Sequence, residues 1–128
     1  MFGRARKPSE RADLGRWGER QAERFLRKKG WTRIERNYTC RSGEIDLIMT
    51  DPEGTLVFVE VKTRQGEHFQ PVETAITPQK KTRMRRAARL FLSSYDTGEC
   101  PCRFDVVAIV AGPAGAPEIR HYPRAFTM

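Results

Sequence analysis

The sequence contains few cysteines and histidines, and this scarcity argues against several kinds of site. The three cysteines, Cys40, Cys100 and Cys102, are an odd number and make a poor disulfide framework. We therefore expect free thiols in a reducing cytoplasm. The two histidines, His68 and His121, have no metal-ligand spacing with another ligand, and the cysteines offer no second closely spaced pair. A structural zinc site is therefore not expected.

Long apolar segments are also absent. No run of apolar residues approaches the roughly 18 that a membrane-spanning helix needs, and residues 1–15 lack the apolar stretch of a secretory signal. We therefore expect a cytoplasmic protein with no membrane partner. A length of 128 residues predicts one domain over residues 1–128 that buries about two-thirds of its unfolded surface. Apolar residues make up 38% of the chain, which is too many for a disordered protein. The polar residues 1–12 are expected to be flexible.

Acidic residues are outnumbered by basic ones. The chain has 16 Asp and Glu against 24 Lys and Arg, a formal net charge of +8. A field of this sign attracts polyanions, and it favours nucleic acid as a partner. Solubility alone is the simpler interpretation, because small domains often carry a net charge of about 2 to 8 in magnitude.

One basic segment has no acidic residue at all. Thr77 and Pro78 are typical of an N-cap and a first helical residue, and the helix that they open is predicted to end near residue 94. No Asp or Glu occurs between Glu73 and Asp96, whereas a solvated helix face usually mixes signs. We predict that this helix tracks a phosphate backbone; a solvated face, or a surface for an acidic protein, is the alternative. The predicted nucleic-acid contacts of this helix are Lys80, Lys81, Arg83, Arg86 and Arg89.

Hydrophobic periodicity predicts two helices and five strands. The predicted helices cover residues 13–29 and 77–94, and the predicted strands cover 31–39, 44–50, 55–62, 103–111 and 118–122. Three consecutive strands favour an antiparallel meander, and the strand after the second helix can return beside it in parallel by a right-handed crossover. The predicted fold class is therefore α/β, a mixed sheet with flanking helices.

Two neighbouring predicted strands carry charged residues at the same end. The turn between them makes the strands antiparallel, so that Asp46 comes close to Glu60, with Glu44 and Lys62 one pleat further along. Charged residues in a strand that is otherwise apolar are costly to bury unless they are paired or bound to an ion. A Glu–Lys pair that emerges into solvent is the simpler interpretation. Several carboxylates beside a lysine instead favour a hard divalent cation, since Mg²⁺ accepts one or two carboxylates and keeps waters for phosphate oxygens.

These residues also carry a family resemblance. The stretch Gly-Glu-Ile-Asp-Leu-Ile at residues 43–48, the triplet Glu60-Val61-Lys62 and Glu19 on the first helix together resemble the PD-(D/E)xK nuclease superfamily. The αβββαβ order resembles the core of its restriction-endonuclease-like fold. The match is closest to the YraN-type family of small bacterial proteins, which is distantly similar to archaeal Holliday-junction resolvases.

The resemblance implies a role for each of these residues. Asp46, Glu60 and the carbonyl of Val61 would be ligands of Mg²⁺ or Mn²⁺, Lys62 would be the catalytic lysine, and Glu19 would be the acidic residue of the first helix. We expect Asp46, Glu60 and Lys62 to open onto one cleft, with Glu19 at its wall.

The function implied by the resemblance is metal-assisted phosphodiester hydrolysis by an endonuclease. DNA is favoured over RNA, with branched or flapped forms as candidate substrates, and Arg64 is predicted to contact nucleic acid at the mouth of the site. The alternative is a nucleic-acid-binding module of the same fold that turns over slowly or not at all. The sequence leaves open the role of Glu44 and the oligomeric state, a homodimer included.

Overall fold

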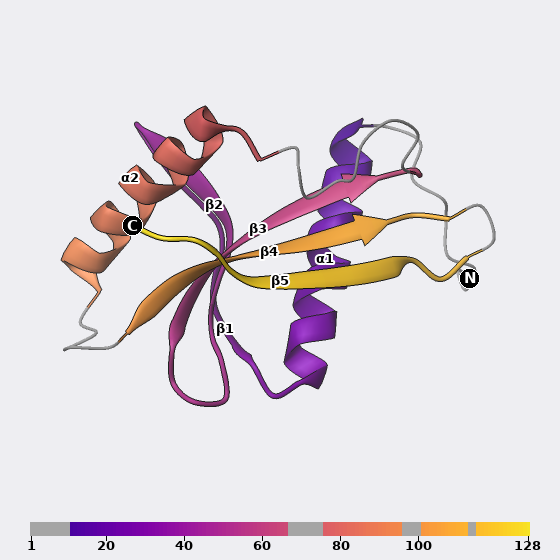
Figure 1. Ribbon diagram of the computed structural model, residues 1–128, viewed down its shortest axis with the longest axis horizontal. Coiled ribbons are helices and arrows are strands. Elements are labelled where there is room, and N and C mark those ends of the chain that lie inside the picture. Colours follow the sequence, from indigo (N-terminus) through magenta and orange to yellow (C-terminus); the bar gives the residue numbers. More distant parts are fainter. Residues whose placement is uncertain (1–10, 67–75, 96–100, 113–114) are drawn as a thin grey trace.

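The computed structural model describes residues 11–66, 76–95, 101–112 and 115–128 (Figure 1). Along the chain, the elements are α1 (Arg11–Lys28), β1 (Thr32–Cys40), β2 (Gly43–Thr50), β3 (Leu56–Arg64), α2 (Pro78–Ser94), β4 (Cys102–Val110) and β5 (Glu118–Phe126). The predicted α/β class and the αβββαβ core are confirmed, and β5 follows as a further strand. None of the described helices is both long and apolar enough to cross a membrane.

The five strands form one mixed sheet in the order β1-β2-β3-β4-β5. β3 and β4 run parallel, from Leu56 beside Cys102 to Arg64 beside Val110, and the other neighbouring pairs are antiparallel. This confirms the predicted return of a strand beside the meander after the second helix. β3 and β4 are central strands covered on both faces, which explains their nearly continuous apolar sequences.

The two helices cover opposite faces of the sheet. On one face, Ala22 and Leu26 of α1 pack in a cluster with Val57, Val59 and Val61. On the other face, buried residues of α2 pack in a second cluster with Leu56, Phe58 and Phe104 of the central strands. Completely buried side chains such as Leu26 and Phe58 each contribute about 1.5–3 kcal/mol. The alternation of β3 therefore fixes which helix each of its side chains meets.

Helix α1 begins earlier than the sequence predicted. The helix includes Arg11 and Ala12, while residues 1–10 lie outside the described residues, and the expected flexibility of residues 1–12 stays a prediction. Asp13 lies in the first turn of the helix, where its negative charge interacts favourably with the positive end of the helix dipole. The predicted N-cap of α2 is confirmed, because the Thr77 hydroxyl accepts a hydrogen bond from the Lys80 amide at 3.1 Å.

Strand β5 is longer than predicted. The predicted strand ends at Tyr122, but the observed strand continues through Pro123, which has no amide hydrogen for a sheet, to Phe126. An edge strand tolerates proline because one side of its backbone makes no sheet hydrogen bonds. The continuation buries Phe126, which stacks on Phe104 with ring centroids 4.6 Å apart. Packing of this aromatic pair therefore outweighs the local proline signal.

Two glycines of α1 give a matched test of how closely the helix approaches the sheet. A Cβ at Gly18 would overlap the Thr63 hydroxyl of β3, whereas a Cβ at Gly15 would meet nothing within 4 Å. We expect Gly18→Ala to lower the free energy of unfolding by about 1–3 kcal/mol. Gly15→Ala should raise it by up to about 1 kcal/mol through helix propensity. Urea unfolding compares the two variants, and equal stabilities would contradict the close contact.

Candidate functional site

The site lies where two neighbouring strands cease to pair. The pairing of β2 with β3 runs from Thr50–Leu56 to Leu47–Val59 and ends there. One residue further on, the Asp46 carboxylate instead accepts a hydrogen bond from the Val61 amide, with 2.8 Å between Oδ2 and N. A side chain thus replaces the strand-to-strand hydrogen bond, and the two strands diverge into a cleft.

The cleft brings together residues from α1, β2, β3 and the first turn of α2. Its volume is about 330 Å³. The lining residues are Leu14, Gly15, Glu19, Asp46, Glu60, Val61, Lys62, Thr63, Arg64, Gln65 and Lys80. All four residues expected to be catalytic lie in this one cleft, together with Arg64 and Lys80 from the predicted nucleic-acid contacts. The other predicted contacts, Lys81, Arg83, Arg86 and Arg89, do not line it.

Glu60 is the most deeply buried acidic residue of the cleft. It is 2% exposed, and its Oε1 atom makes no hydrogen bond. Two ammonium groups approach it, with Lys80 Nζ at 3.6 Å from Oε1 and Lys62 Nζ at 3.9 Å from Oε2. Burial, and then the neighbouring Asp46 charge, raise the pKa of Glu60 to about 8. The Glu60 carboxyl therefore holds its proton at neutral pH unless another cation compensates its charge.

Asp46 and Glu60 are neighbouring acidic residues of the cleft, and the Asp46 charge is one reason that the pKa of Glu60 is raised. Burial raises the pKa of Asp46, and the hydrogen bond from the Val61 amide opposes that increase. Two acidic side chains in one cleft, both with raised pKa values, are suited to hold a cation that compensates their charge.

Glu19 joins this pair from the opposite wall. Burial, and then the Asp46 charge, raise the pKa of Glu19 to about 7, while a hydrogen bond with the Asn37 side chain lowers it. Asn37 adopts a left-handed conformation in β1, with φ of 49°. Asn37 is not among the predicted site residues, and its contact with Glu19 joins α1 to β1.

Lys80 is more central to the site than its predicted place on a basic helix surface. Its side chain is 19% exposed, and its Nζ lies 3.4 Å from Glu44 Oε2 as well as 3.6 Å from Glu60 Oε1. Burial lowers the pKa of Lys80, but the charges of Glu60, Asp46 and Glu44 outweigh burial and raise it overall. Lys80 follows the Thr77 cap by three residues, in a helical turn that normally favours anions. Because a cation is unfavourable in that position, its presence there indicates that Lys80 pairs with acidic residues outside the helix.

The donor atoms of the cleft fit a hard divalent cation. In the described residues, no three or more His, Cys, Asp and Glu side chains are grouped to hold a metal ion. Mg²⁺ needs only one or two carboxylates and keeps several waters, so the Asp46–Glu60 pair is sufficient. The buried Glu60 Oε1, which lacks a hydrogen-bond partner, is an available anionic donor.

Comparison with known proteins places this site in a family. Residues 18–109 match the Uncharacterised protein family UPF0102, and this span includes every predicted catalytic and metal-binding residue. The chain belongs to the UPF0102 family. This confirms the resemblance to YraN-type proteins.

UPF0102 relatives are similar to this chain over most of its length. A UPF0102 protein of Symbiobacterium thermophilum is 45% identical over 113 residues, covering 88% of this chain and 95% of the relative. One from Pelotomaculum thermopropionicum is 41% identical over 114 residues, covering 88% and 94%. Among solved structures, a repair endonuclease from Pyrococcus abyssi matches with a TM-score of 0.45 and 22% identity, over 87% of this chain and 42% of that one. The similarity to the repair endonuclease is distant.

The raised pKa of Glu60 predicts an unusual pH dependence of stability. The folded protein holds this proton to a pKa of about 8, against an ordinary value of 4.5. The folded state therefore binds more protons than the unfolded state across this window, and rising pH favours unfolding. We expect the free energy of unfolding in EDTA to fall by up to about 1.4 kcal/mol per pH unit between about pH 5 and pH 8.

Urea unfolding across that pH range measures this effect. Glu60→Gln should flatten the decline, while Glu53→Gln, in the exposed turn between β2 and β3, should leave it unchanged. A wild-type protein whose stability holds constant or rises from pH 5 to pH 8 would contradict the burial of an uncompensated Glu60 carboxylate.

Proposed function

We propose that this UPF0102 protein is a metal-dependent nuclease that hydrolyses phosphodiester bonds in DNA, with branched or flapped forms as candidate substrates. The observation that carries the proposal is the buried Glu60 carboxyl, beside Asp46 and two lysine ammonium groups. Acidic groups that are removed from water are costly as structure alone. Their position in an open cleft, within reach of a substrate, gives that cost a functional reason.

The carboxylates of Asp46 and Glu60, with the Val61 carbonyl, would hold Mg²⁺ or Mn²⁺. When bound, such an ion polarises a phosphoryl oxygen and lowers the pKa of a coordinated water. Carboxyl groups with raised pKa values must be deprotonated before they hold a metal ion, so metal affinity should rise with pH. Lys62 and Lys80 already lie beside Glu60, and either ammonium group offsets negative charge that develops on a phosphate in the transition state.

Other residues of the cleft position the substrate and handle protons. We assign to Lys62 the orientation of the attacking water, and to Arg64, exposed at the end of β3, a bidentate contact with a phosphate. Glu19, with its pKa near 7, is suited to accept or donate a proton at neutral pH.

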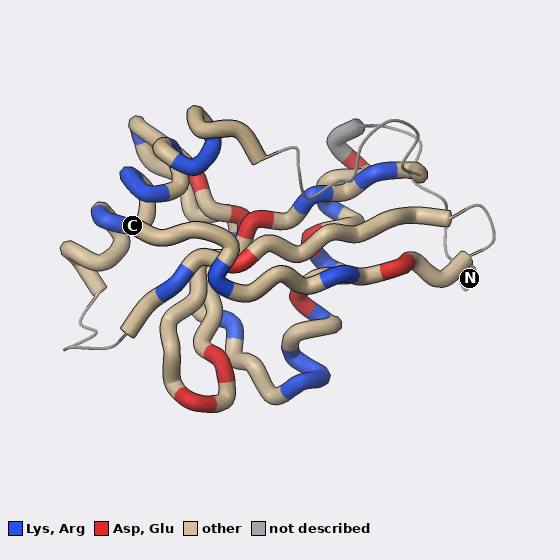
Figure 2. The backbone as a smooth tube through the Cα atoms, in the orientation of Figure 1, with Lys and Arg blue, Asp and Glu red and all other residues tan. Residues whose placement is uncertain are grey.

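Helix α2 supports nucleic acid as the substrate. Figure 2 shows Lys and Arg recurring along α2. Arg83, Arg86 and Arg89 are exposed on this helix, and the first turn of the same helix delivers Lys80 to the cleft. Contacts of such side chains with phosphates are indifferent to base sequence, which suits a substrate recognised by its shape.

A binding module without turnover is the second candidate. Lys80 Nζ lies between Glu44 and Glu60, so the chain itself supplies a cation that compensates the acidic pair. In that case the basic side chains bind nucleic acid while the carboxylates only position Lys80. This function requires the basic surface but no metal.

The deciding experiment is a nuclease assay of the purified protein on linear, flapped and four-way DNA, with Mg²⁺, Mn²⁺ or EDTA. A nuclease should cleave at least one substrate with metal and none with EDTA. Salt-dependent DNA binding without cleavage of any substrate would reject the nuclease and favour the binding module. Absence of both cleavage and binding would reject nucleic acid and favour an acidic protein partner.

A further inference from the structure

A second basic surface lies on α1, on the opposite face of the sheet from α2. Its cationic side chains line a hollow of about 490 Å³ against the end of the helix and β1. The lining residues are Arg20, Glu23, Arg24, Arg27, Lys28 and Arg36. We call this set the α1 basic surface. It has five cations and one carboxylate.

The carboxylate of the α1 basic surface is already saturated. Glu23 is 5% exposed and accepts two hydrogen bonds from Arg36, at 2.7 and 3.2 Å. Arg33 and Arg27 also lie within 3.4 and 3.6 Å of its Oε2 atom. One buried acid therefore organises three arginines, and it has no capacity to neutralise the remaining cations.

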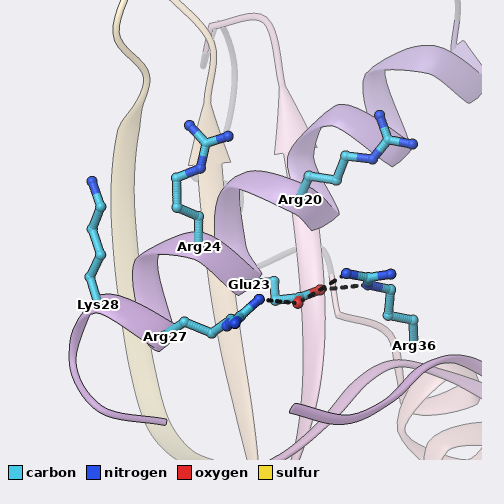
Figure 3. A pocket seen from close by; sticks show the side chains of 6 residues that line it. All are labelled: Arg20, Glu23, Arg24, Arg27, Lys28 and Arg36. Atoms are coloured by element: carbon cyan, nitrogen blue, oxygen red, sulfur yellow. Dashed lines mark hydrogen bonds and ion pairs between the residues drawn. The ribbon is translucent and has the colours of Figure 1, made fainter. Parts of the chain in front are cut away.

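Three cations of this surface have no acidic partner among the described residues. Figure 3 shows Arg20, Arg24 and Lys28 extending from the helix, while Arg27 and Arg36 converge on Glu23. Arg20, Arg24 and Lys28 are all exposed. Like charges gathered around a hollow repel one another. An external anion with several regularly spaced charges relieves this repulsion most effectively when it binds.

The α1 basic surface is continuous with the cleft. An intermediate hollow of about 210 Å³ shares Glu19 with the cleft, and it shares Arg20, Glu23 and Arg36 with the basic surface. The three hollows thus follow α1 from Gly15 to Lys28. At the rise of an α-helix this path is about 20 Å long, which is the length of about 6 base pairs of duplex DNA.

We propose that the α1 basic surface binds the phosphate backbone of the same nucleic acid that enters the cleft. This proposal rests on the proposed function, which supplies the class of substrate. It adds that the nucleic acid extends along α1, beyond the bond that is cleaved. Four of the five cations are arginines, whose guanidinium groups form bidentate contacts with phosphates. An acidic peptide lacks a regular array of doubly accepting phosphate groups, so nucleic acid fits the surface better.

The test compares two charge-matched double variants of the full chain. Arg24→Gln/Lys28→Gln removes two cations from the α1 basic surface, and Arg41→Gln/Arg124→Gln removes two exposed cations from the β1–β2 turn and from β5. Glutamine has nearly the same helix propensity as arginine and lysine. Unchanged unfolding midpoints should verify that both variants fold.

The assay measures binding of a labelled duplex in EDTA across a series of salt concentrations. The duplex has about 20 base pairs, well over the roughly 6 that the three hollows along α1 span. The α1 variant should bind about tenfold or more weakly, and its salt slope should fall by about 2, one for each lost phosphate contact. The control variant should bind within about twofold of wild type. An equal loss of DNA affinity in both variants would overturn the proposal, because the net charge of the protein would then explain binding.

This experiment separates the surface from the proposed catalysis, because binding in EDTA needs no turnover. If the wild type cleaves nothing but the α1 variant alone loses affinity, the surface stands and the nuclease fails. If the wild type cleaves and the α1 variant binds as the wild type does, the surface fails and the nuclease stands. A labelled polyglutamate peptide serves as the competing ligand. If it binds as tightly as the duplex, and if the same substitutions abolish its binding, nucleic acid is overturned as the occupant.

Discussion

Asp46→Asn should reduce metal-dependent cleavage by at least about 100-fold while leaving metal-free DNA binding intact or stronger. Asparagine keeps the volume of aspartate and an oxygen that can accept from the Val61 amide, so the divergence of β2 and β3 is preserved. What is lost is the anionic ligand of a hard cation. In EDTA, removing a negative charge that faces phosphate also removes a repulsion. The expected magnitude follows from losing electrostatic stabilisation of the transition state.

Cleavage of linear, flapped and four-way DNA with Mn²⁺ measures the first effect, and binding in EDTA measures the second. Glu53→Gln is the matched control, because it removes one carboxylate from an exposed turn outside the cleft. Lys62→Ala should also abolish cleavage but leave Mn²⁺ affinity intact or higher by calorimetry, since a nearby cation is removed. Cleavage that survives unchanged in Asp46→Asn and Lys62→Ala would mean a contaminating nuclease or another site.

Asp105→Asn should lower the free energy of unfolding by about 3–5 kcal/mol at pH 7, although Asp105 does not line the cleft. The side chain is fully buried in β4. It accepts hydrogen bonds from Arg103 Nε at 2.9 Å and from the Arg124 amide at 3.1 Å, and its Oδ2 lies 2.7 Å from His121 Nε2. Arg103 also donates to Asp51 at 2.9 Å. One carboxylate therefore ties β4 to β5 and to the turn after β2.

The effect of Asp105→Asn should shrink in acid. Burial opposes ionisation, but hydrogen bonds with His121 and Arg103 outweigh it and hold the pKa of Asp105 below its usual range. A carboxyl group whose pKa is lowered by folding stabilises the protein above about pH 4 and loses that contribution as the pH falls further. At about pH 3 the carboxyl group of the unfolded chain is largely protonated, so the wild type should exceed Asp105→Asn in stability by less than at pH 7.

Urea unfolding at both pH values measures the difference between wild type and Asp105→Asn. Glu118→Gln is the control, because it weakens an ion pair with Arg120 in which the Glu118 side chain is 59% exposed. Such exposed pairs contribute about 0.2–1 kcal/mol. A loss from Asp105→Asn no larger than from Glu118→Gln, or a loss independent of pH, would show that the buried network does not stabilise the folded state.

The order of the elements and the place of the acidic pair could be predicted from local patterns. The alternation of Leu56, Phe58 and Glu60 predicts a shared face of β3, and the turn after β2 sets the register that brings Asp46 to Glu60. A strand that is apolar on both faces predicts a central position. Short-range periodicity contains all of this information.

The extent of β5 and the surroundings of Lys80 could not be predicted in this way. Phe126 extends β5 because it packs on Phe104, which lies 22 residues earlier in the chain. Lys80 reaches Glu60 because α2 packs across the sheet with its first turn beside the cleft. Both contacts depend on the position at which a helix or a strand packs against the rest of the sheet. The periodicity of the element itself does not determine that position.

By itself, the sequence determined the class of the fold, the faces of its strands and the convergence of Asp46, Glu60 and Lys62, because these follow from periodicity and one turn. The tertiary structure decided that Lys80 belongs to the cleft and that Glu23 gathers arginines from α1 and β1. Such pairings join elements distant in sequence, and their energies depend on burial and separation, which exist only once the helices have packed on the sheet.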